Sequence, residues 1–146
     1  MYSKSSLKIS VILFLFIVIL TLSSCTANGT KMEFSFNTGS PSNSIDVKTI
    51  YINNDMDKLV LNAELKIDSG DAIVKILSVF DNEVIWNGSY QEDSNFIIEL
   101  LDLEENSEYL LKVETTQSKK VSLIVTSDDK LVKDKEKPEK YIIEKK

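Results

Sequence analysis

The sequence predicts an all-β protein, an antiparallel β-sandwich of about seven to eight strands. Apolar and polar residues alternate with a period of two along most of residues 45–127, the spacing of half-buried strands. Clusters of Gly, Asn, Asp and Ser separate these stretches, and no amphipathic stretch is long enough for a helix. With 146 residues, one compact domain is expected once any targeting segment is removed.

The expected strands are placed by their apolar faces. The clearest covers 59–67, where every second residue from Leu59 to Ile67 is apolar. Residues 73–80 are apolar on both faces and suit a central position. Asp68-Ser69-Gly70-Asp71 and Asp81-Asn82 are expected as hairpin turns, because Gly, Asn and Asp tolerate a positive φ. The other expected strands are 45–52, 84–90, 96–100, 109–113 and 121–125.

The first 25 residues carry the most specific signal in the chain. Lys4 and Lys8 precede the unbroken apolar residues 11–20, and small residues follow in 21–25. This is the layout of an export signal, whose positive start stays in the cytoplasm while the apolar part enters the membrane. An uncleaved signal anchor is one alternative, although residues 9–22 fall short of the roughly 18–20 residues that span a bilayer. A plain secretory signal with a chance cysteine is another.

The segment Leu22-Ser23-Ser24-Cys25 resembles the lipobox of bacterial lipoproteins, in which a leucine and small residues precede a cysteine. The resemblance implies that a dedicated signal peptidase cuts between Ser24 and Cys25. It also implies that the Cys25 thiol carries a diacylglycerol with fatty chains such as palmitate, which hold the chain on the membrane. Residues 1–24 would be the cleaved signal peptide, and 25–44 a lipidated tether with the first strand or loop. The expected location is the extracytoplasmic face of the cell membrane.

Composition argues against catalysis and against nucleic-acid binding. All 17 basic residues are lysine and histidine is absent, so the usual base near neutral pH and the usual phosphate clamp are both missing. We expect no enzyme activity and no cofactor, and the single cysteine excludes an internal disulfide. Without residues 1–24, which hold two lysines and no acid, 15 lysines face 23 acids, a net charge of −8. Such a surface repels the phosphates of nucleic acids.

Few side chains are candidates for ligand contact. Trp86 and Tyr90 lie on one face of an expected strand and would stack on a sugar if exposed. A core position is the alternative, because Val84 lies on the same face. The turn 53–57, and Asp68 with Asp71, offer oxygen ligands to calcium, but neither has acids at the offsets of a calcium loop, and no metal site is expected.

The segment from Leu103 to Val113 resembles the corner and strand of fibronectin type III and related immunoglobulin-like domains, with a leucine six residues before Tyr109. The resemblance implies an immunoglobulin-like or jelly-roll-like sandwich in which the Tyr109 hydroxyl ties down the preceding loop. The segment departs from that pattern at Glu105, where proline is usual. The sandwich domain is expected over 45–127.

Residues 128–146 are mostly lysine and acid, and they are expected to form a charged, flexible tail. Their apolar trio Tyr141-Ile142-Ile143 either caps the chain's own sheet or adds a strand to the sheet of a partner.

These observations predict a membrane-anchored, non-catalytic binding module of the cell envelope, with a protein, a cell-wall polysaccharide or a substrate as its ligand. A structural or assembly subunit of an exported complex is the alternative. An exposed aromatic or apolar patch would favour a binding module, whereas an unprotected sheet edge or an ordered tail would favour an assembly subunit.

Overall fold

The computed structural model describes residues 30–145, and the regular structure in this range is entirely β. The expected signal peptide, its cleavage point between Ser24 and Cys25 and the lipid attachment site lie outside the described residues. No helix of the described part is long and apolar enough to cross a membrane. The strands are β1 (Met32–Ile52), β2 (Met56–Ile67), β3 (Asp71–Ser78), β4 (Val84–Tyr90), β5 (Ser94–Leu103), β6 (Glu108–Ser127), β7 (Lys130–Lys133) and β8 (Lys140–Glu144).

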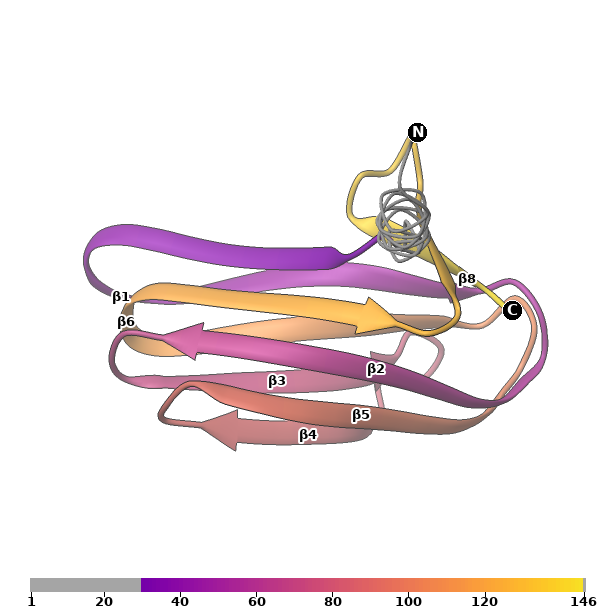
Figure 1. The fold of residues 1–146 in the computed structure, drawn as a ribbon, viewed down its shortest axis with the longest axis horizontal. Coiled ribbons are helices and arrows are strands. Elements are labelled where there is room, and N and C mark those ends of the chain that lie inside the picture. Colours follow the sequence, from indigo (N-terminus) through magenta and orange to yellow (C-terminus); the bar gives the residue numbers. More distant parts are fainter. Residues whose placement is uncertain (1–29, 146) are drawn as a thin grey trace, which may run out of the picture.

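Two long strands, β1 and β6, run through both layers of a sandwich. Residues 32–37 of β1 pair with 120–125 of β6, and residues 44–51 pair with 108–115. Between these halves the register of β1 shifts, and Gln117 of β6 has a φ of 58°, so both strands bend at the same place. Figure 1 shows them turning back at the left-hand end, with one half in the nearer layer and one half in the farther layer.

The bend divides the strands into a four-stranded and a six-stranded sheet. The four-stranded sheet has the order β5-β2-β6-β1 and uses the first half of β1 and the second half of β6. The six-stranded sheet has the order β4-β3-β6-β1-β8-β7 and uses the other halves. All pairs are antiparallel except β1 with β8, which is parallel. The predicted all-β sandwich is therefore confirmed.

The core lies between the two sheets and is built from the predicted alternation. Leu59, Leu61 and Leu65 of β2 are buried, while the residues between them are exposed or half-buried. Each such side chain stabilises the fold by about 1.5–3 kcal/mol through the apolar surface it removes from water. The largest fully buried side chains are Phe34, Met32, Ile50, Ile52, Leu59, Leu61, Leu65, Ile76, Ile98, Leu111, Leu123 and Leu131.

The two predicted turns have different roles. Asp81-Asn82 closes the β3–β4 hairpin as expected, with Asn82 at a φ of 59°. The turn 68–71 also has the expected positive φ, 74° at Gly70, but it is not a hairpin turn. It joins β2 and β3, which lie in different sheets and pair with different halves of β6. The hairpin prediction was wrong there because local turn chemistry does not specify whether the flanking strands pair.

The sandwich extends beyond the expected 45–127 at both ends. β1 begins at Met32, and both Met32 and Phe34 are buried. The expected flexible tail is wrong for residues 130–144, which form β7 and β8. Tyr141 and Ile143 are buried in the core, and β8 pairs with residues 49–52 of β1. Of the two predictions for the apolar trio 141–143, the structure shows the one in which it caps the chain's own sheet.

The corner before β6 is held by a tyrosine from another strand. Leu103 is buried and Tyr109 packs against the core, on the inner side of the sandwich. In the described part of the chain, the phenol that binds the preceding loop belongs to Tyr51 of β1, whose hydroxyl donates to Asn106 Oδ1. The Asn106 N–H also donates to the Ile52 carbonyl at 2.8 Å. The loop is therefore fixed to β1.

Candidate binding surface

The outer face of the four-stranded sheet carries two adjoining hollows. The first has a volume of about 410 Å³ and the second about 450 Å³. Both lie over β2 and β6, and they adjoin between Glu64 and Lys66 of β2. The first is lined by Ser35, Lys66, Ile67, Asp68, Asp93, Lys120, Val121 and Ser122. The second is lined by Asn62, Ala63, Glu64, Asn95, Phe96, Ile97, Ile124 and Thr126.

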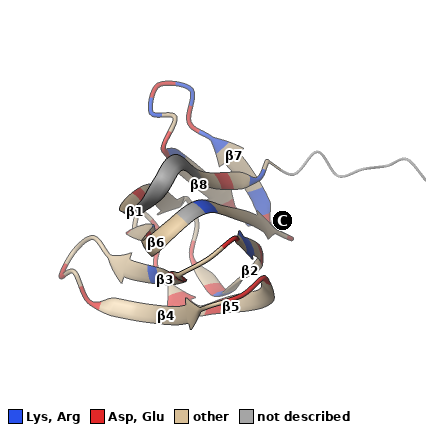
Figure 2. Cartoon of the chain, turned by 90° about the vertical axis from the view of Figure 1, so that its left-hand side faces the viewer, with Lys and Arg blue, Asp and Glu red and all other residues tan. Residues whose placement is uncertain are grey.

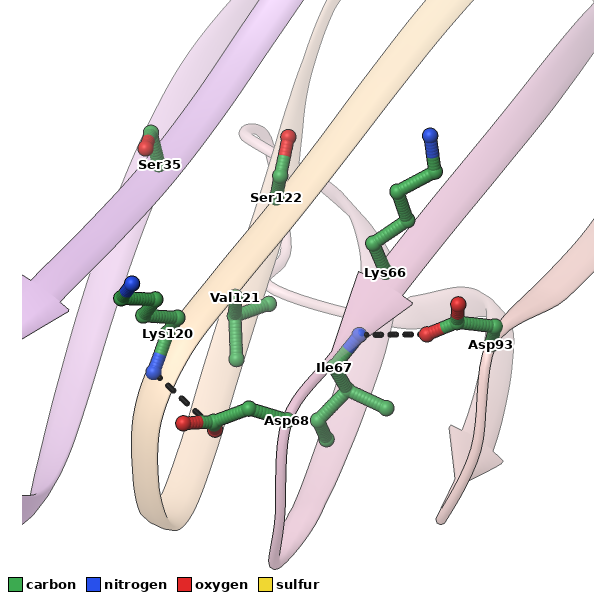
Figure 3. Close-up of a pocket in the computed structure, with 8 residues that line it drawn as sticks. All are labelled: Ser35, Lys66, Ile67, Asp68, Asp93, Lys120, Val121 and Ser122. Atoms are coloured by element: carbon green, nitrogen blue, oxygen red, sulfur yellow. Dashed lines mark hydrogen bonds between the residues drawn. The ribbon is translucent and has the colours of Figure 1, made fainter.

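The strand register of the sheet brings the polar groups of the first hollow together (Figure 3). Lys66 of β2 is opposite Ser122 of β6, and Ser122 is opposite Ser35 of β1, so the three form one row across the sheet. Lys120 lies at the bend of β6, at the end of the same hollow. Two hydroxyl groups and two ammonium groups therefore share this space.

The two carboxylates of the first hollow are bound to backbone amides. The Ile67 N–H donates to Asp93 Oδ1 at 2.9 Å, and the Lys120 N–H donates to Asp68 Oδ1 at 3.0 Å. Figure 3 marks both bonds, which lie where β2 and β6 reach their turns. These acids fix the loop ends that close the hollow, and hydrogen bonds of this charge-assisted kind are stronger than neutral ones.

Acidic side chains on this sheet face are neutralised by lysines. The pairs are Lys31–Glu33 at 2.7 Å, Lys66–Glu64 at 3.0 Å and Lys58–Glu99 at 2.7 Å. The hydrogen bond and the charge of Glu64 raise the pKa of Lys66. Lys120 forms no ion pair with any residue that the structure describes. The Lys120 ammonium shares the first hollow with the carboxylates of Asp68 and Asp93, so this hollow holds as many acids as lysines.

The second hollow combines amides, a hydroxyl and aliphatic side chains. Asn62 and Asn95 provide donors and acceptors, and Thr126 provides a hydroxyl. Ile97 is 57% exposed beside them, and Ile124 is half-buried. The surface therefore offers hydrogen bonds together with apolar contact, the mixture found in ligand sites.

The predicted stacking residues Trp86 and Tyr90 lie elsewhere. Both point inward at the edge between β4 and β5, half-buried, and stack on Phe96 of the opposite sheet. The ring centroids are 5.8 Å apart for Trp86–Phe96 and 4.3 Å apart for Tyr90–Phe96. Burial raises the pKa of the Tyr90 hydroxyl. The structure thus shows the predicted packing role. The reason given for it, a face shared with Val84, was wrong, because the register shifts between Ile76 and Leu77 and Val84 is 44% exposed.

Within residues 30–145, no group of three or more His, Cys, Asp or Glu side chains is placed to hold a metal ion. The turns considered for calcium use carboxylates to bind backbone. Asp55 accepts a hydrogen bond from the Glu105 N–H at 2.7 Å, and Asp68 accepts the one from Lys120. Their acids therefore act as loop anchors.

Apart from Asp68, which was considered for calcium, sequence reasoning missed the residues of both hollows. The period of two already assigns Asn62 and Lys66 to the outer face of their strand. What the sequence lacks is the strand order, which places Ser35 and Ser122 beside them although they are far apart along the chain.

The fold and this face define a β-sandwich with a polar, hollowed surface on one sheet. A family model described as "Domain of unknown function (DUF4624)" matches residues 22–139, and the chain belongs to this family. Among curated proteins, no match was found.

Several solved structures are similar to this chain. A structure described as "CBM4 structure and function" has a TM-score of 0.43 and 11% identity, over 70% of this chain and 90% of that one. PliG of Aeromonas hydrophila, a periplasmic inhibitor of g-type lysozyme, has a TM-score of 0.40 and 15% identity, over 68% and 85%. PirA has a TM-score of 0.42 and 10% identity, over 70% and 98%. All three similarities are distant.

Proposed function

We propose that this protein is a lipid-anchored, non-catalytic binding module of the bacterial cell envelope. Its ligand is a hydroxyl-rich cell-wall polymer with anionic groups, bound on the outer face of the four-stranded sheet. The observation that supports this most directly is the pair of adjoining hollows lined by hydroxyls, amides, lysines and carboxylates. These groups hydrogen-bond sugar hydroxyls, while Ile97 and Ile124 contact the apolar faces of sugar rings.

Charge balance lets this face accept a ligand with anionic groups. The net charge of −8 outside residues 1–24 repels anions from most of the surface. On the outer face of the four-stranded sheet, lysines pair with Glu33, Glu64 and Glu99. In the first hollow, two lysines offset the carboxylates of Asp68 and Asp93. A hydrogen bond to a charged group contributes about 1.5–3 kcal/mol, so each contact is weak. Binding then depends on several repeats of one polymer engaging many anchored copies.

The proposed anchor keeps this surface near the membrane. The lipobox-like Leu22-Ser23-Ser24-Cys25 provides the attachment cysteine, and β1 begins at Met32. An extended chain spans at most about 3.6 Å per residue, so this short linker reaches no farther than about 25 Å. The ligand would therefore be a polymer next to the membrane.

The binding proposal is tested with the full-length protein in detergent and purified peptidoglycan sacculi. We expect co-sedimentation, and we expect Lys120→Ala to weaken it about fivefold, or about 1 kcal/mol. Lys133→Ala on β7 is the control, since it removes the same charge from an exposed lysine of the other sheet. Absence of binding, or equal loss in both variants, would contradict the proposal.

The anchor is tested separately by expressing Cys25→Ser in cells fed labelled palmitate. The wild-type protein is expected to incorporate the label and to fractionate with membranes. The variant is expected to carry no label and to keep its signal peptide. Labelling of the variant to the wild-type level would refute attachment at Cys25.

A further inference from the structure

The free edge of β4 differs from the other sheet edges of the described chain in carrying no charge. Each of the other edges does: β7 begins and ends with lysine, β5 contains Glu99 and Asp102, and the first half of β1 contains Glu33. Charges on edge strands prevent pairing with other chains. Val84–Tyr90 has none, which leaves β4 open to strand addition.

The edge is also held in an extended conformation. Residues 86–90 pair without interruption with residues 72–76 of β3. On the inner side, Trp86 and Tyr90 are fixed by stacking on Phe96 of the opposite sheet. A preorganised strand loses little conformational entropy when another strand pairs with it. In this mode backbone hydrogen bonds supply affinity, and the side chains of alternate residues supply specificity.

Both ends of β4 are acidic. Asp81 and Glu83 precede the strand, and Glu92 and Asp93 follow it. A hollow of about 710 Å³ lies at the second end, lined by Ser89, Tyr90, Gln91, Glu92 and Ser94. Figure 2 shows β4 without charged residues along its length and acidic residues in the hairpin loop that precedes it.

The hairpin tip adds apolar surface and more acid at the first end. Phe80 is 97% exposed and Val79 is 40% exposed, beside Glu104 and Glu105 in a hollow of about 410 Å³. The Val79 N–H donates to the Glu108 carbonyl at 3.0 Å, which ties the tip to the start of β6. An exposed aromatic side chain on an acidic rim favours an apolar partner with positive charge.

A second copy of this chain is a poor occupant. In an antiparallel pair of β4 strands, Asp81 and Glu83 of one copy would lie near Glu92 and Asp93 of the other. Like charges placed opposite one another destabilise a strand pair. A strand with an uncharged middle and basic ends avoids this repulsion, because its charges are opposite to those at both ends of β4.

We propose that β4 is a docking edge for an extended segment of a second protein, with uncharged β-forming residues in its middle and lysine or arginine at both ends. This site adjoins the polymer-binding face at Asp93, which also lines the first hollow, but the two proposals are tested by different variants and ligands and can fail separately. It would make the protein an assembly partner within the envelope.

The test uses the full-length protein in detergent and a fluorescent nonapeptide of alternating valine and threonine with two lysines at each end. We expect saturable binding in fluorescence anisotropy that weakens as salt is added. The same peptide with glutamate ends is expected not to bind. Hydrogen exchange of the wild-type complex should show new protection confined to β4.

Ile85→Lys places a charge on the edge and is expected to weaken binding at least about tenfold. Ile45→Lys is the matched control, because it makes the same change at an exposed isoleucine of β1, a strand of the same sheet that does not pair with β4. Equal effects of the two variants, equal binding of both peptides, or protection at another edge would overturn the proposal. So would a dimer of the protein that Ile85→Lys disrupts.

Discussion

Gly88 is the residue whose small size matters most in this structure. It lies between Trp86 and Tyr90 on the inner side of β4, where both rings stack on Phe96. A Cβ atom at this position would lie 2.6 Å from the Tyr90 hydroxyl and 2.9 Å from Trp86 Cη2. The aromatic stack therefore depends on a position without a side chain.

Gly88→Ala is expected to lower the free energy of unfolding by about 1–2 kcal/mol. Overpacking costs about 1–3 kcal/mol, and the usual benefit of replacing glycine in a strand offsets part of it. Chemical denaturation measures the change. Ser89→Ala, an exposed neighbour on the same strand, is the control and should change stability by less than about 0.5 kcal/mol. A Gly88→Ala protein as stable as the wild type would show that the rings move aside freely.

Glu114 is the centre of a charge cluster on the outer face of the six-stranded sheet. Its carboxylate binds the Lys112 ammonium at 2.7 Å and the Lys75 ammonium at 3.0 Å. Hydrogen bonds from these two lysines hold the pKa of Glu114 below its ordinary value of 4.5. The unfolded state therefore binds more protons in acid, and the stabilisation is present above pH 4.5 and lost as the pH falls through the lower, folded-state pKa.

Glu114→Gln is expected to destabilise the protein at pH 7 by at most about 1 kcal/mol, since the cluster is partly exposed. The difference from wild type should shrink below about pH 4.5, where the wild-type carboxylate also becomes neutral. Urea denaturation at several pH values measures both effects. Glu136→Gln, at an exposed glutamate outside the described ion pairs, should leave the pH profile unchanged. A difference that grew in acid would contradict the assigned cause.

At the scale of the element, β8 shows that a charged segment can contribute to the core. Tyr141 and Ile143 face inward and are buried, whereas Ile142 faces outward and is half-buried. The Lys140 ammonium lies over the Tyr51 ring at 4.3 Å and binds Glu108 at 2.6 Å, so the polar residues of the strand attach it to β1 and β6. The inward and the outward side chains of β8 thus both stabilise its place in the sheet.

Ile143→Ala is expected to cost about 2–5 kcal/mol, the usual range for emptying a buried isoleucine site. Ile142→Ala is the matched control, with the same change one residue away on the outer face, and should cost much less. Thermal and urea unfolding of both variants measure the difference. Equal and small effects would mean that β8 frays in solution and does not seal the core.

β2 was predictable from the sequence and β8 was not, because the pattern of β2 is local whereas β8 depends on a distant partner strand. The alternation from Leu59 to Leu65 is local, and one buried face is enough to produce it. β8 is a short apolar trio within a charged run, and its parallel partner β1 lies about ninety residues earlier. The candidate face has the same limitation, because Lys66 and Ser122 become neighbours only through the sheet order. Trp86 was correctly predicted to pack inward, but the reason was wrong, because the register shift beside Leu77 puts Val84 on a different face.

At the scale of the whole molecule, the two sheets share their central strands. β1 and β6 each contribute one half to each sheet, so neither sheet retains its middle if the other unfolds. β8 pairs with β1 on the side of the six-stranded sheet remote from β4. A perturbation at one edge is therefore transmitted to the other through β1 and β6.

We therefore expect one cooperative unfolding transition for the described domain. Trp86 is the sole tryptophan of the chain and reports on the β4–β5 edge, whereas far-UV circular dichroism reports on all strands. The two signals should give the same urea midpoint in the wild type. In Ile143→Ala, a change at the opposite edge, both midpoints should shift together by the same amount. A shift in circular dichroism without a shift in Trp86 fluorescence would show that the β7–β8 edge unfolds independently, and that the shared strands do not couple the two sides.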